Sequence, residues 1–132
     1  MLNLGLLIIR LVIGLSFAGH GTQKLFGWFG GYGIKGTGQW MESVGIKPGA
    51  TMAFLAGLTE LVGGLLFAAG LLTPIASILI AATMVVAIAK VHGANGFWAT
   101  QNGYEFNVVL IAVVIGVALT GPGHYALDAI LF

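Results

Sequence analysis

Long apolar segments alternate with short polar or glycine-rich segments along the whole chain. A helix needs about 20 apolar residues to cross the hydrocarbon core of a bilayer. Four such helices are expected, over residues 4–26, 49–72, 74–91 and 104–120. The last of these is short for a span and would need little tilt or a thinned bilayer. Four crossings would place both termini on one side of the membrane, here called the terminal side, and the two longer loops on the other, here called the loop side.

Glycine, proline and aromatic residues mark the ends of the expected helices. Thr73 and Pro74 predict a tight reversal, because proline is tolerated at the first position of a helix. The glycine- and aromatic-rich segment 27–33 suits a membrane interface, where Trp and Tyr rings lie at headgroup level. A short interfacial helix should follow the first span, with Thr37 as its N-cap and residues 39–44 as its body.

The composition supports an all-α, integral membrane four-helix bundle that forms one domain over residues 1–132. Apolar residues make up 58% of the chain and charged residues 7%, and the mean hydropathy is +1.03. So few polar side chains cannot cover a water-soluble globule. A net charge of +1 gives no basic field for nucleic acid. The absence of cysteine excludes disulfides and thiol redox chemistry by this chain itself.

Each expected helix carries one face of small or ionisable residues, which we expect to turn inward and give the bundle a polar core. On the first helix this face comprises Arg10, Gly14, His20, Gly21 and Lys24. On the second it comprises Ala53, Ala56, Gly57, Glu60, Gly63, Gly64 and Phe67. The third offers Ala76, Thr83, Ala87 and Lys90, and the fourth offers Glu105, Ala112, Gly116 and Thr120.

The ionisable residues on these faces form a column across the membrane. Glu60 is expected near mid-bilayer, with a partner in Arg10 or His20, because an unpaired carboxylate at that depth would protonate. One interpretation is purely structural: an Arg10–Glu60 ion pair, and a second pair of Glu105 with Lys24 or Lys90, would fix the helix register. The favoured interpretation is a ligand pocket framed by His20, Lys24, Glu60, Lys90, His92 and Glu105.

Haem or a metal ion is a less favoured occupant of this pocket. His20 and His92 could act as a bis-histidine pair, or could join Glu105 in a metal site. Such ligands are too sparse to define a site, so no metal is expected. The aromatic residues are expected to act mainly as interface anchors, with Trp98 the best candidate for stacking on a ligand.

Several motifs in order resemble those of the DoxX family of small bacterial membrane proteins. The first runs from Arg10 to Gly14 and on through His20, Gly21 and Lys24 to Phe26. The others are Gly57-Leu-Thr-Glu60-Leu-Val-Gly63-Gly64 with Gly70, Thr73 and Pro74; Ala89-Lys90-Val-His92; Glu105; and Gly121-Pro-Gly123 with Leu127-Asp128. The resemblance implies a multi-pass protein of the bacterial plasma membrane. Asp128 matches the family's C-terminal motif and is expected to act as a structural tether.

The resemblance also implies quinone or sulfur redox chemistry. The expected function is that of a membrane oxidoreductase component that binds a quinone-like or sulfur-compound substrate in the polar pocket. A quinone needs an apolar slot, donors such as His20 or Lys24, and a proton path to which Glu60 and Glu105 could contribute. The electrons would come from the substrate or from a soluble or membrane-bound redox partner.

Two other functions stay open. The chain could be a non-catalytic membrane anchor or adaptor whose polar core only holds the helices together. It could also be a small permease for aromatic or sulfur compounds, in which case a second copy of the chain would be needed to form an alternating path.

Overall fold

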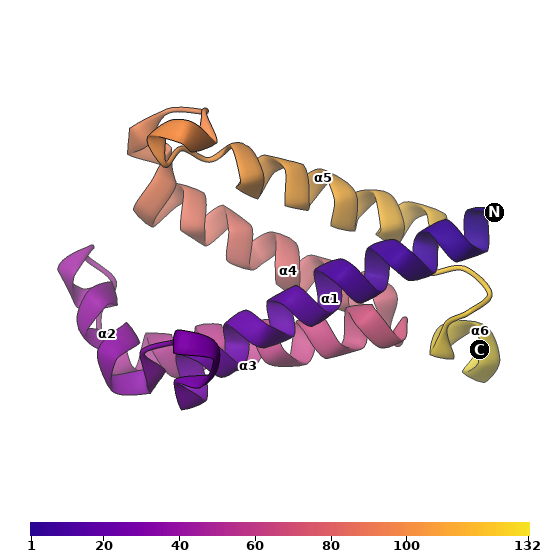
Figure 1. The fold of residues 1–132 in the computed structure, drawn as a ribbon, viewed down its shortest axis with the longest axis horizontal. Helices are drawn as coiled ribbons and strands as arrows, with labels where there is room; N and C mark the ends of the chain where they lie inside the picture. Colours follow the sequence, from indigo (N-terminus) through magenta and orange to yellow (C-terminus); the bar gives the residue numbers. More distant parts are fainter.

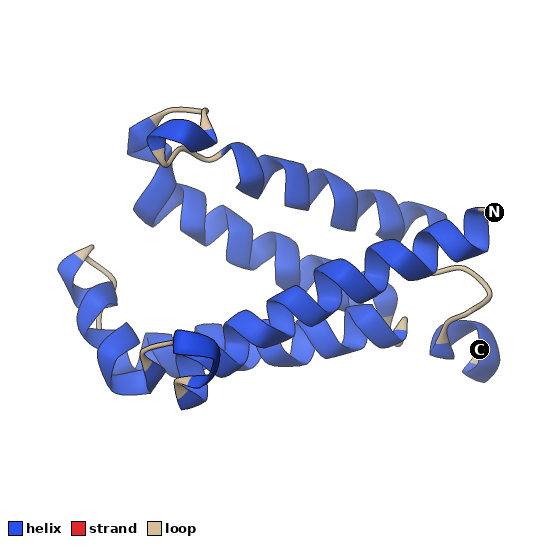
Figure 2. Ribbon diagram, viewed as in Figure 1, coloured by secondary structure: helices blue, strands red, loops and turns tan.

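The computed structural model describes residues 1–132 and is entirely helical, without strands (Figure 2). This confirms the expected all-α class. The four long helices are α1 (Leu2–Phe26), α3 (Gly49–Ala69), α4 (Thr73–Ala87) and α5 (Glu105–Thr120). The shorter elements are η1 (Trp28–Gly30), α2 (Gly33–Ser43), η2 (Ile88–His92), η3 (Gly93–Asn95), η4 (Ala99–Gln101) and α6 (Leu127–Leu131).

Three helices are long and apolar enough to cross a membrane. They are Leu2–Phe26, Gly49–Ala69 and Thr73–Asn95, the last of which continues α4 through the π-helix η2. Large apolar side chains such as Ile78 and Leu119 are exposed on the outer faces, as expected for contact with lipid. The chain is therefore a multi-pass membrane protein. Helix α5 is equally apolar but has only 16 residues, so a fourth crossing stays a prediction.

The long helices form two arms that meet on the terminal side. Helix α1 lies antiparallel to α3 in one arm, and α4 pairs with α5 in the other (Figure 1). Figure 1 shows the two arms separating toward their loop-side ends. Apolar residues of all four helices fill the angle between the arms near the terminal side: Leu6, Phe17, Phe67, Ala76, Ile80, Val114 and Val117. The core therefore occupies one half of the molecule and leaves the other half open.

Glycines bring α1 and α3 into direct backbone contact. A Cβ built on Gly14 would lie 2.5 Å from the backbone nitrogen of Ala68, and one on Gly21 would lie 2.6 Å from the carbonyl oxygen of Gly57. On α3, a Cβ on Gly64 would lie 2.5 Å from the carbonyl oxygen of Gly14. Lipid is as apolar as leucine, so membrane helices associate through such close packing. These contacts fix the antiparallel register of the two helices.

The faces predicted for the four helices are confirmed to different degrees. On α3 every predicted residue is buried or half-buried, including Glu60 with 6% of its surface exposed. On α5 the prediction is wrong for Ala112 and Thr120, which are exposed, whereas Glu105 and Gly116 are half-buried and the unpredicted Asn107 is buried. Almost every α5 position is apolar, so the sequence gives a helical wheel little contrast from which to choose a face.

The short helix after the first span begins earlier than predicted. Helix α2 starts at Gly33, so Thr37 lies in its body and is buried rather than acting as an N-cap. Helix α2 packs on the start of α3, where a Cβ on Gly38 would lie 2.8 Å from the backbone nitrogen of Ala50. It therefore covers the loop-side end of α3.

Two glycines on α1 offer a matched test of the backbone contact. Gly21→Ala places a methyl group against α3 and should lower the free energy of unfolding by about 1–3 kcal/mol, the usual cost of overpacking. Gly19→Ala adds the same methyl group to the same helix, where nothing lies within 4 Å, and should not destabilise the protein. Thermal unfolding in mild detergent measures both variants. Equal losses in the two variants would contradict the proposed packing.

Candidate functional site

A cavity of about 910 Å³ lies in the loop-side half, between the two arms. Twenty-four residues line it, and 15 of these are hydrophobic. Helix α1 contributes Phe17, His20 and Lys24, and α3 contributes Glu60. Trp40 and Met41 of α2 also line the cavity, as does Ile46 of the loop that follows. The cavity is thus an apolar space with a few polar side chains, as is typical of small-molecule sites.

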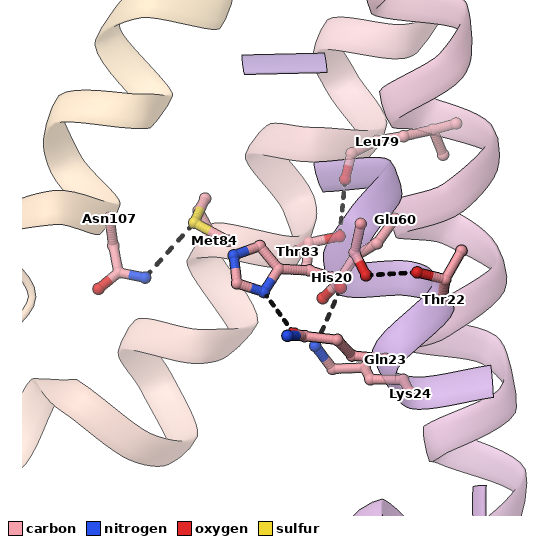
Figure 3. A network of polar contacts seen from close by, with 10 residues as sticks. His20, Thr22, Gln23, Lys24, Glu60, Leu79, Thr83, Met84 and Asn107 are labelled. Atoms are coloured by element: carbon pink, nitrogen blue, oxygen red, sulfur yellow. Dashed lines mark hydrogen bonds and ion pairs between the residues drawn. The ribbon is translucent and has the colours of Figure 1, made fainter. Parts of the chain in front are cut away.

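Lys24 and Glu60 form an ion pair in the wall of this cavity. Lys24 Nζ donates to Glu60 Oε2 at 2.9 Å, and the Lys24 side chain is 24% exposed (Figure 3). The backbone contact between α1 and α3 makes the Lys24–Glu60 ion pair possible, because Gly57 has no side chain in the space that the aliphatic part of Lys24 occupies. A Cβ on Gly57 would lie 3.1 Å from Lys24 Cβ. Glu60 Oε1 makes no hydrogen bond within the protein and is free to bind a ligand.

His20 lies one helical turn before Lys24 and also lines the cavity, but it is exposed, so its prediction as part of a buried inward face is wrong. Its Nδ1 is 3.1 Å from Gln23 Oε1, while Gln23 Nε2 donates to the carbonyl oxygen of Phe29 at 3.2 Å. The Phe29 carbonyl fixes the orientation of the amide, so Nδ1 carries the proton in the neutral imidazole. The remaining nitrogen, Nε2, is then an acceptor that no group of the protein uses.

The opposite wall carries three polar or polarisable side chains that the sequence analysis did not select as a site. Thr83 and Met84 come from α4 and Asn107 comes from α5, and all three line the cavity. Asn107 Nδ2 donates to Met84 Sδ at 3.4 Å, and Thr83 Oγ1 donates to the carbonyl oxygen of Leu79 at 2.9 Å (Figure 3). In the sequence, Asn107 is marked only by being the single polar residue in the apolar run from Phe106 to Ile111.

The other predicted ligand residues divide between the cavity and the surrounding loops. His92 lines the cavity, and its Nδ1 lies 2.9 Å from the carbonyl oxygen of Asn102. Lys90 is exposed and does not line the cavity. Glu105 Oε1 accepts from the backbone nitrogen of Ala99 at 3.0 Å, so it holds the preceding loop to the start of α5. The predicted pairing of Glu105 with Lys24 or Lys90 is therefore wrong.

The possible metal site at His20, His92 and Glu105 is not assembled. Glu105 lies outside the cavity that the two histidines line, and no group of three His, Asp or Glu side chains lies close enough together to hold a metal ion.

Arg10 belongs to a second polar cluster on the terminal side, well away from the cavity. Its Nη1 donates to the carbonyl oxygen of Ala68 at 3.1 Å, and its Nη2 donates to that of Tyr125 at 2.6 Å. The predicted Arg10–Glu60 ion pair is therefore wrong. In the register set by the glycines, Arg10 lies level with Ala68, two turns or about 12 Å along the axis from Glu60.

Asp128 completes this cluster as the expected tether. It accepts hydrogen bonds from the backbone nitrogens of Leu72 and Thr73 at 2.7 and 2.9 Å and from Thr73 Oγ1 at 2.7 Å. Burial alone would raise the pKa of Asp128, but the hydrogen bonds from Thr73 and Leu72 and the nearby Arg10 charge outweigh it and lower that pKa. Asp128 thus caps the start of α4 and attaches the C-terminal segment to it.

Comparison with known proteins supports the resemblance noted in the sequence. Residues 5–93 match the profile of the family described as DoxX. The chain is also similar to a protein of Bacillus subtilis (strain 168) named "Putative oxidoreductase CatD". The two are 34% identical over 130 residues, which cover 98% of this chain and 89% of the relative. No solved structure matches the chain.

A double-mutant cycle tests the ion pair. Lys24→Met and Glu60→Gln should each destabilise the protein, because each leaves a polar partner unpaired in the cavity wall. The double variant should lose less than the sum, with a coupling energy on the order of 1–2 kcal/mol. Unfolding of all three variants in the same detergent gives this value.

The cycle of Glu60→Gln with His20→Ala is the control. His20 contacts Gln23 rather than Glu60, so the effects of these two substitutions should add. Additive effects in the Lys24 cycle, or strong coupling in the His20 cycle, would show that Lys24 is not the partner of Glu60.

Proposed function

The chain belongs to the DoxX family, and on this premise we propose that it is the membrane component of an oxidoreductase that binds a quinone-like aromatic molecule in the loop-side cavity. The observation that carries the proposal is the Lys24–Glu60 pair in the wall of an otherwise apolar cavity. The oxidoreductase name of the Bacillus subtilis relative supports the reaction class.

The cavity fits such a ligand in size and lining. Its volume of about 910 Å³ lies near the upper end of small-molecule sites, which are about 300–1,000 Å³. Phe17, Met41 and Leu110 supply apolar surface for a ring, and Met84 supplies a polarisable sulfur of the kind that packs against aromatic edges. The volume also leaves room for ring substituents or the start of a lipid tail.

The polar side chains fit the oxygen atoms of the same ligand. A quinone takes up two electrons and two protons when it is reduced to a hydroquinone. Lys24 can donate a hydrogen bond to a ring oxygen, and its charge favours added electron density there. The free Nε2 of His20 can accept a proton, Glu60 can hold one at Oε1, and the Lys24 ammonium group can give one to the ring oxygen. These three groups give the site both donors and acceptors.

The electrons are exchanged with a partner enzyme. The chain has no cysteine, so thiol redox chemistry by the chain itself is excluded. A soluble or membrane-bound redox enzyme that docks on the loop side would have a short path to the cavity, because Trp40, His92 and Asn102 line it from that side. The protein's own task is then to hold the ring and to handle the protons.

Removal of the Lys24 charge tests this proposal. Lys24→Met keeps most of the apolar stem but removes a charged donor, so affinity for tetramethyl-1,4-benzoquinone should fall roughly tenfold or more. Quenching of tryptophan fluorescence measures binding, since Trp40 lines the cavity. Lys35→Met is the matched control, because Lys35 is exposed on α2, outside the cavity, and its loss should leave affinity unchanged.

Melting temperature must be measured on the same samples. A sharp fall in melting temperature, with unchanged affinity in the fraction still folded, would show that the ion pair only stabilises the fold. That result would favour the adaptor function. No binding by the unaltered protein would reject the quinone-like ligand.

A further inference from the structure

Asn107 is a buried polar side chain whose hydrogen-bonding capacity is barely used. Only 8% of its surface is exposed, and it lines the cavity. A carboxamide offers two N–H donors and an acceptor oxygen. The one hydrogen bond that the Asn107 side chain makes is from Nδ2 to Met84 Sδ, at 3.4 Å. A thioether sulfur is a weak acceptor, so most of the capacity of Asn107 remains free.

The neighbours of Asn107 do not account for it. Leu110, about one turn further along the same helix, is apolar and also lines the cavity, and Val114 beyond it belongs to the apolar core. The nearby hydroxyl group of Thr83 donates to the carbonyl oxygen of its own helix at Leu79. Buried polar groups in proteins nearly always have a good partner, and an exception calls for an explanation. A ligand in the cavity would supply that partner.

The position of Asn107 complements that of Lys24. Lys24 and Glu60 belong to the α1–α3 arm, whereas Asn107 belongs to the α4–α5 arm across the cavity. In Figure 3 the Asn107 amide nitrogen points toward Met84, on the side where His20 lies. The cavity therefore has two polar poles separated by apolar surface. Such a site suits a molecule with polar atoms at both ends of a flat apolar ring.

We propose that Asn107 is a specificity-determining residue that binds the second oxygen of a para-dioxygenated aromatic ring whose first oxygen is bound by Lys24. This inference rests on the proposed function and adds to it the substitution pattern of the ligand. A ring with a single oxygen fills the same apolar space but leaves Asn107 unpaired. Leaving a buried polar group unpaired is what allows a site to reject a ligand that lacks one oxygen.

Two ligands that differ by one hydroxyl group test the proposal. Tetramethylhydroquinone and 2,3,5,6-tetramethylphenol are titrated anaerobically into the detergent-solubilised protein, with tryptophan fluorescence as the signal, to which the cavity-lining Trp40 contributes. The unaltered protein should bind the hydroquinone about three- to tenfold more tightly than the phenol, the effect of one net hydrogen bond. Asn107→Leu should bind the phenol at least as well and should lose the preference.

Val109→Leu is the matched control. Val109 is exposed on the same helix and does not line the cavity, so the preference for the hydroquinone should persist. If Asn107→Leu does not fold, Asn107→Ala provides the same comparison with a smaller side chain. A preference retained in the Asn107 variants would overturn the inference while leaving the proposed function intact. Binding of neither ligand by the unaltered protein would overturn both.

Discussion

The backbone contact between α1 and α3 determines which charged side chains of these two helices meet. Gly14 and Gly21 on α1 meet Gly64 and Gly57 on α3, and a side chain at Gly14, Gly21 or Gly64 would clash with the backbone of the facing helix. Lipid offers no hydrophobic drive for helix association, so this close packing carries much of the stability of the pair. It also sets the register, which brings Lys24 beside Glu60 and leaves Arg10 two turns away on the terminal side.

The resulting polar groups form two clusters with different tasks. On the terminal side, Arg10 binds carbonyl oxygens of the α3 end and of the C-terminal segment, while Asp128 caps α4. This cluster lies beside the apolar core and holds the ends of four segments together. On the loop side, the two arms separate, and Lys24, Glu60 and His20 line an open cavity. The helices are thus packed together at one end and leave a ligand-sized space at the other.

The sequence predicts most of the fold, because apolar length and helix-breaking residues are local properties. The four long helices and the inward face of α3 agree with the pattern of small residues around Glu60. The pairing of the charges could not be predicted, since it depends on the register of two helices whose contacts are distant in sequence. Arg10, Lys24 and His20 all lie near one face of α1, and only the glycine contacts decide which of them reaches Glu60. Asn107 was missed because the uniformly apolar α5 hides which of its faces is buried.

A redox role for this protein requires that an aromatic redox molecule occupies the loop-side cavity. The most direct measurement is mass spectrometry of the small molecules that remain with the protein after purification from its native membrane in mild detergent. We expect a quinone or hydroquinone in the purified protein, and a strongly reduced amount in a Lys24→Met variant that is still folded. Equal amounts in both proteins, or lipid alone in the unaltered protein, would contradict it.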